Sequence, residues 1–179
     1  MVNNLGLLLK KMGKLEEAKS LYEEALQARR ETLGDRHPDT LISINNMGLL
    51  LKDMGRLEEA KPLYEVDLQA SRETLGDRHP KTLTSIGNMG LLLKDMGKLE
   101  EARPLYEEAL QACRETLGDR HTDTLDSINN MAQLLYAQGK LEEAVAFFEE
   151  AVQGYTETLG TDHPRTQNAV SGLQMLKSQ

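Results

Sequence analysis

The chain has 179 residues, of which 39% are hydrophobic and 28% are charged, a composition typical of a folded domain and unlike a disordered segment. The formal net charge of −8 argues against nucleic acid binding, because that function needs a basic surface. Cys113 is the single cysteine, which excludes an internal disulfide and a cysteine-based metal site.

No segment predicts a membrane span or a signal peptide. The longest apolar run, Ala144 to Phe148, is far shorter than the roughly 20 residues that cross a bilayer. Residues 1–13 carry lysines and asparagines and lack the long apolar centre of a signal peptide. We therefore expect a cytoplasmic protein that does not contact membranes.

A repeat of 42 residues dominates the sequence. Residues 3–44 match residues 45–86 at 33 of 42 positions, residues 45–86 match 87–128 at 33, and residues 87–128 match 129–170 at 20. A fixed period of this length indicates stacked units that cannot bury their apolar faces alone. We expect one repeat domain over residues 1–179, with units at about 1–38, 39–80, 81–122 and 123–164.

Each unit is predicted to hold two helices, A and B. In the second unit helix A covers about 39–54, with its apolar face formed by Leu41, Ile44, Met47, Leu50, Leu51 and Met54. Helix B covers about 57–75, with its apolar face formed by Leu57, Ala60, Tyr64, Leu68 and Leu75. Gly55 and Gly76 should end these helices, because glycine adopts a positive φ at little cost.

Two features of helix B depart from this pattern. Pro62 and Pro104 fall in its second turn, where each removes one backbone hydrogen bond. Asp67 stands where the other units have Ala25, Ala109 and Ala151, a position that should face the neighbouring helix. A carboxylate there is unfavourable unless a partner or solvent reaches it, so we expect Asp67→Ala to stabilise the fold.

A last helix is predicted over about 165–177, covering the end of the fourth unit. We expect its inward residues to be Val170, Leu173 and Leu176, and its outward residues to be Asn168, Ser171 and Gln179. Short turns between the helices force antiparallel neighbours. The predicted fold is therefore all-α, a right-handed superhelical solenoid of antiparallel helix pairs.

The residues Gly13, Ala18, Tyr22 and Ala25, and their copies one period later, resemble the tetratricopeptide repeat. The 42-residue length, the paired asparagines and the Leu-Gly-Asp-Arg-His-Pro linker are similar to the longer repeats of kinesin light chains. This resemblance covers essentially the whole chain. It implies that the A helices line a concave groove in which a protein partner binds.

The resemblance places fourteen residues of this chain in the partner-binding groove. They are Asn4, Leu7, Lys10, Asn45, Asn46, Leu49, Lys52, Asn88, Leu91, Lys94, Asn129, Asn130, Gln133 and Tyr136. The asparagines at positions 4, 46, 88 and 130 have two interpretations: their amides bind the backbone of an extended ligand, or they bond to the next A helix and hold the stack. The lysines at positions 10, 52 and 94 could attract acidic groups, although Asp53 and Asp95 lie beside two of them.

The sequence predicts no catalytic, metal or cofactor site. The four histidines recur once per unit at 37, 79, 121 and 163, too far apart to share a metal, and we expect each to cap or pack the next helix. Paired glutamates such as Glu16 and Glu17 complement the helix dipole at exposed helix starts. Cys113 has no neighbouring base pattern, and no glycine-rich phosphate loop is present.

We therefore predict a non-enzymatic scaffold that binds a peptide or helix of another protein in the A-helix groove. The alternatives are a structural spacer, an array that self-assembles end to end, and a regulatory repeat segment of a larger switch protein. The fourth unit departs most from the others, with Gln133, Tyr136 and Phe147-Phe148, and could provide either a docking site or a terminal cap.

Overall fold

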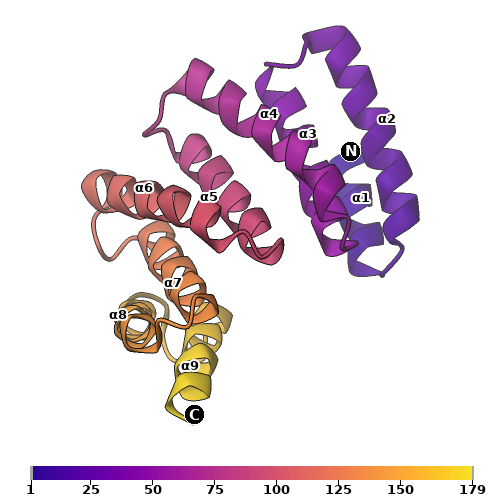
Figure 1. The fold of residues 1–179 in the computed structure, drawn as a ribbon. Helices are drawn as coiled ribbons and strands as arrows, with labels where there is room; N and C mark the ends of the chain where they lie inside the picture. The colour runs from indigo at the N-terminus through magenta and orange to yellow at the C-terminus, as the bar shows by residue number, and fades with distance from the viewer. Residues whose placement is uncertain (1, 179) are drawn as a thin grey trace. The chain divides into compact units, whose positions relative to one another are not determined.

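The computed structural model describes residues 2–178, and within that range it contains nine helices and no strand (Figure 1). The all-α prediction is therefore confirmed. The A-type helices are α1 (Val2–Lys11), α3 (Pro38–Asp53), α5 (Pro80–Asp95), α7 (Thr122–Ala137) and α9 (Pro164–Lys177). The B-type helices are α2 (Leu15–Leu33), α4 (Leu57–Leu75), α6 (Leu99–Leu117) and α8 (Leu141–Leu159).

The helix boundaries follow the glycines and prolines that the repeat carries. Helix α4 has the predicted bounds, α3 begins and ends one residue earlier than predicted, and α9 begins one residue earlier, at Pro164. Gly55 and Gly76 have φ of +73° and +86°, a backbone conformation that favours glycine. The chain can therefore leave each helix at these positions without steric cost.

Histidine caps the A-type helices that follow a B-type helix. The Nδ1 atom of His37 accepts a hydrogen bond from the backbone N–H of Asp39 at 3.1 Å. His79, His121 and His163 accept the equivalent bond from the residue two positions later, at 3.1–3.2 Å. Each imidazole satisfies one of the free N–H groups at a helix start, which confirms the structural role expected for these residues.

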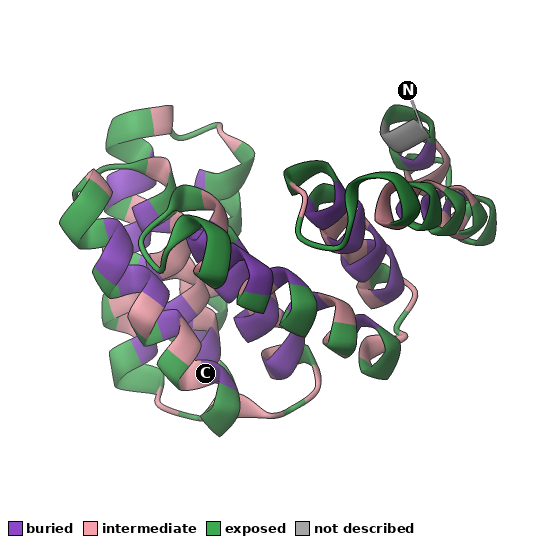
Figure 2. Ribbon diagram, turned by 90° about the horizontal axis from the view of Figure 1, so that it is seen from above, coloured by how far each residue is buried: buried purple, intermediate pink, exposed green. Residues whose placement is uncertain are grey.

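The chain forms two compact units, the first ending at Leu92 and the second beginning at Leu93, inside α5. Figure 2 shows buried residues on the facing sides of the helices within each unit. A core cluster of the first unit is Leu26, Leu41, Ile44 and Ala70. A core cluster of the second is Leu110, Leu125, Ile128, Ala151, Tyr155 and Ala169. A single domain over residues 1–179 stays a prediction.

Paired helices pack closely where a glycine of helix A meets an aromatic ring of helix B. A Cβ atom added to Gly48 in α3 would lie 3.0 Å from Cε1 of Tyr64 in α4. Tyr64 is 1% exposed, and the adjacent Ala60 is fully buried. This contact fixes the position of α4 on one side of α3, so the opposite side of α3 is left for solvent or a ligand.

Two details of the predicted faces are wrong. Leu75, predicted on the buried face of α4, is 38% exposed, because it lies in the last turn beyond the contact with the neighbouring helices. In α9 the most buried residues are Thr166 and Ala169, while Val170 and Leu173 are only half-buried. Leu176 is buried and Asn168 and Ser171 are exposed, as predicted, and Gln179 lies outside the described residues.

Asp67 lies at the contact between α4 and α5 and is 1% exposed, as its position in the repeat predicts. Ser85 Oγ donates a hydrogen bond to Asp67 Oδ2 at 2.6 Å, while Oδ1 is buried without a hydrogen-bond partner. Burial raises the pKa of the Asp67 carboxyl group, and the Ser85 hydrogen bond and the Lys81 charge only partly oppose this. The carboxylate is thus half satisfied, so the expected stabilisation by Asp67→Ala stays a prediction.

Candidate functional site

The predicted groove residues lie on the part of the A-type helices that is not buried against helix B. We call this surface the A-helix face. Asn4 and Leu7 of α1 are exposed, and the other twelve predicted residues are partly exposed. In α3 the buried residues include Leu41, Ile44 and Leu50, which alternate with the A-helix face at helical spacing. A ligand can therefore reach side chains of every predicted class: amides, leucines, lysines and a tyrosine.

Within the first unit, an asparagine pair joins neighbouring A-type helices. Asn88 Nδ2 of α5 donates a hydrogen bond to Asn45 Oδ1 of α3 at 2.8 Å. At this position the amide serves the structural interpretation of the asparagine ladder. In the second unit, Asn129 Oδ1 of α7 is buried without a hydrogen-bond partner in the described structure. Because an unpartnered buried acceptor is costly, Asn129 is a candidate to accept a hydrogen bond from a ligand.

The lysines of the A-helix face contact polar residues of the next A-type helix. Lys10 Nζ lies 2.6 Å from Asp53 Oδ2, and both side chains are partly open to solvent. Lys94 Nζ donates a hydrogen bond to Gln133 Oε1 at 2.8 Å. The Asp53 carboxylate therefore offsets the charge of Lys10, as the sequence indicated. An acidic ligand would have to compete with these contacts.

In the second unit, the A-helix face opens into a pocket of about 480 Å³. It is lined by Lys94, Gln133, Tyr136, Ala137, Phe148, Asn168, Ser171, Gly172 and Met175. Three of these residues are predicted groove residues, and the structure brings them together. The pocket combines an ammonium group, two amides and a tyrosine with apolar surface from α7, α8 and α9. We call it the α7–α9 pocket.

The contributions of α8 and α9 to this pocket were not predicted. Phe148 is 3% exposed, and a Cβ atom added to Gly172 would lie 2.5 Å from its Cε1 atom, so glycine leaves room for the ring. Met175 is 55% exposed. A signal for two of these residues existed in the period, because Gly172 and Met175 follow the predicted groove residues Asn130 and Gln133 by 42 positions.

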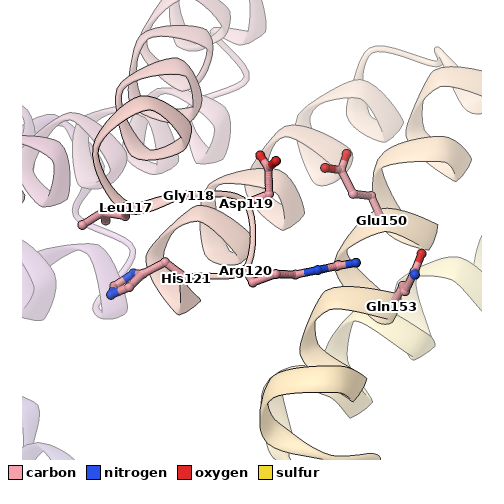
Figure 3. A pocket seen from close by; sticks show the side chains of 7 residues that line it. All are labelled: Leu117, Gly118, Asp119, Arg120, His121, Glu150 and Gln153. Carbon is pink, nitrogen blue, oxygen red and sulfur yellow. The ribbon is translucent and has the colours of Figure 1, made fainter.

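A second depression, of about 740 Å³, lies at the turn between α6 and α7 and beside α8 (Figure 3). It is lined by Leu117, Gly118, Asp119, Arg120, His121, Glu150 and Gln153, none of which is a predicted groove residue. Its charged groups are already paired: Arg114 contacts Glu150 at 2.6 Å, and Arg120 contacts Glu157 at 3.0 Å. We call it the α6–α7 depression, and it serves below as a reference surface.

The chemistry of the described residues gives no catalytic or metal-binding constellation. Residues 2–178 contain no group of three or more His, Cys, Asp or Glu side chains that could hold a metal ion. Cys113 is buried, and burial raises the pKa of its thiol, which disfavours the nucleophilic thiolate. None of the nine helices in this range combines the length and hydropathy that a membrane span requires.

Comparisons with known proteins agree with this architecture. The tetratricopeptide repeat model matches residues 1–66, 45–115, 83–157 and 123–173. No curated protein matches the sequence. Among solved structures, a kinesin-light-chain-like protein of Podosopora anserina with nearly identical TPR-like repeats is 26% identical, with a TM-score of 0.84 for a point variant and 0.83 for a second structure. Each match covers 99% of this chain and 84% of that protein.

A bacterial structure gives a similar match. BtubC (BKLC) from P. vanneervenii is 26% identical, with a TM-score of 0.83 over 99% of this chain and 70% of the other. The shared feature of all three structures is the repeat fold, extended over nearly the whole chain.

Proposed function

Since the chain belongs to the tetratricopeptide repeat family, with repeats of the kinesin-light-chain-like class, we propose that it binds a peptide or helix of another protein on the A-helix face. Repeats of this family generally mediate protein–protein interaction or scaffolding. The fold is typically a non-enzymatic scaffold, which fits a role in binding.

The α7–α9 pocket is the observation that carries this proposal. Ligand sites in proteins are usually concave, largely apolar and supplied with a few polar groups that orient the ligand. The pocket has this composition: Phe148 and Met175 provide apolar surface, while Gln133, Tyr136 and Asn168 provide hydrogen-bonding groups. We propose that an apolar side chain of the partner enters here.

The partner's backbone is the proposed ligand of the amides on the A-helix face. An asparagine side chain can donate to a carbonyl oxygen and accept from an N–H group, which suits a segment whose own backbone is unpaired. The buried Oδ1 atom of Asn129 supports this assignment, because a ligand N–H group would satisfy it. Asn88 is a poorer candidate, since its amide already bonds to Asn45.

The test is an affinity capture from an extract of the source cells, comparing the wild-type chain with the double variant Tyr136→Ala, Met175→Ala. Both side chains line the pocket and are accessible, so we expect the variant to fold and to lose the captured partner by about tenfold or more, the scale of an interface hot spot. Circular dichroism confirms folding of each variant.

The matched control is Arg120→Ala, Gln153→Ala in the α6–α7 depression. This variant also removes two surface side chains from the second unit, and we expect it to capture the same partner as the wild type. Equal capture by the pocket variant, or equal loss by both variants, would contradict binding at the α7–α9 pocket.

A further inference from the structure

Helix α1 carries an exposed apolar stripe. Leu5 is 49% exposed, Leu8 is 53% exposed, and Met12, directly after the helix, is 60% exposed. Positions i, i+3 and i+7 lie on one side of a helix, so the three side chains form one continuous surface. We call it the α1 stripe.

The same positions are buried in the later A-type helices. One period after Leu5 and Leu8 stand Met47 and Leu50 of α3, which are 5% and 0% exposed. Their counterparts in α7, Met131 and Leu134, are 4% and 0% exposed. The α1 stripe therefore has the composition of a core surface, and within the described residues no helix covers it. An uncovered core surface of this kind marks an interaction site.

The last A-type helix presents a different surface. Where α7 has Ala132 and Leu135, which are 0% and 2% exposed, α9 has Gln174 and Lys177, and both are exposed. Polar residues thus replace the apolar residues with which an A-type helix packs against its own helix B. Helix α9 offers no apolar face that matches the α1 stripe.

We propose that two copies of this chain associate through the α1 stripe, with the two α1 helices antiparallel about a two-fold axis. In such an isologous contact one surface covers itself, so no second complementary surface is needed. A head-to-tail contact would need an apolar face elsewhere, and the polar residues of α9 do not supply it. Association therefore stops at the dimer and does not grow into a filament.

The charges of α1 favour the antiparallel arrangement. Its basic residues, Lys10 and Lys11, lie in the last turn, and the first turn contains no acidic residue. Parallel helices would bring four lysines together, whereas antiparallel helices separate the two pairs to opposite ends of the contact. Helix dipoles also oppose one another in the antiparallel pair, which is the more favourable orientation.

The size of the stripe sets the strength of the contact. Three half-exposed side chains from each copy make an interface below about 1,200 Å² in total, in the range of weak or transient complexes. We therefore expect a dimer that forms at micromolar concentrations. The α7–α9 pocket takes no part in it, so this inference and the proposed function can fail independently.

The test is sedimentation velocity of the 179-residue chain from low micromolar to several hundred micromolar concentration. We expect a monomer–dimer equilibrium with no larger species. The double variant Leu5→Gln, Leu8→Gln should dimerise at least about tenfold more weakly, a change that corresponds to the loss of its apolar contact. Met175→Gln, a change at a similarly exposed side chain of α9, is the control and should leave the dimer unchanged.

A mixing experiment separates the two geometries. Labelled Leu5→Gln, Leu8→Gln chain should not associate with excess wild type if α1 packs against α1, because each dimer needs two intact stripes. Association of that mixture, weakening by Met175→Gln, or species larger than a dimer would overturn the proposal, as would a wild-type chain that stays monomeric throughout. If the double variant loses its helical circular dichroism, Met12→Glu, outside the helix and most exposed, replaces it.

Discussion

The contact between α4 and α5 in the first unit and that between α8 and α9 in the second use equivalent positions with different chemistry. In the first contact Asp67 meets Ser85, and Ser71 lies beside them, with its Oγ atom 3.5 Å from that of Ser85. In the second contact Ala151 and Ala169 stand in place of Asp67 and Ser85, and both are fully buried. One polar contact and one dry contact therefore support the same local helix arrangement.

The difference shows that an acid at this position depends on its partner across the contact. Ser85 can donate to Asp67 because its hydroxyl group lies on the facing side of α5. Ala169 has no such donor, so a carboxylate introduced at position 151 would face only apolar atoms and backbone. The repeat geometry decides that position 67 is buried, and the neighbouring side chain decides how much a polar group costs there.

The largest effect should come from placing the acid in the dry contact. Ala151→Asp buries a carboxyl group with no hydrogen-bond donor on α9, and we expect a loss of about 2–4 kcal/mol in the free energy of unfolding. Urea denaturation measures it. Ala109→Asp is the matched control, because Ser127 of α7 stands one period after Ser85, and its loss should be smaller. Equal losses for the two variants would contradict a partner-dependent cost.

A smaller effect of opposite sign is expected when the acid is removed from the polar contact. Asp67→Ala eliminates the buried Oδ1 atom that lacks a partner, while Ser85 Oγ keeps its hydrogen bond to the carbonyl oxygen of Lys81 at 3.1 Å. We expect a gain of about 1 kcal/mol at pH 7. A lower melting temperature for the variant would show that the Ser85 hydrogen bond outweighs the burial of the carboxylate.

The pH dependence of that gain tests its cause. The folded-state pKa of Asp67 is raised above the ordinary value of 3.8, so the folded state holds this proton more tightly than the unfolded state. The penalty of the ionised group is therefore absent below the ordinary pKa and grows as the pH rises through the folded-state pKa. The stability difference between Asp67→Ala and wild type should shrink on acidification, and a constant difference would exclude ionisation as the cause.

The smallest effect concerns the hydroxyl group that borders the dry contact. Tyr155 is 1% exposed, and its hydroxyl group donates a hydrogen bond to Asp126 Oδ1 in α7. Burial raises the pKa of Tyr155, with the Asp126 carboxylate adding to the effect. Tyr155→Phe keeps the ring and should cost about 0.5–1.5 kcal/mol, measured by thermal denaturation. No change would indicate that water replaces the hydroxyl group at Asp126.

The sequence predicts the helices well because glycine and proline mark their ends in every unit. It predicts burial of position 67 for the same reason, since the counterparts of this residue are alanines at a regular spacing. The partner of Asp67 was not predicted, because Ser85 and Asp67 lie on different helices and no local pattern links them. In the same way, the α7–α9 pocket depends on how α9 packs on α8, and α9 departs from the repeat at most positions.

The histidine caps give this protein a chemical weak point at four places at once. A cap of this kind requires a lone pair on Nδ1, and a protonated imidazole has none. Acid would thus take away the same acceptor ahead of α3, α5, α7 and α9, leaving one backbone N–H unsatisfied at each. Fraying would start simultaneously at every B-to-A junction, and amide hydrogen exchange would accelerate first at Asp39, Lys81, Asp123 and Arg165.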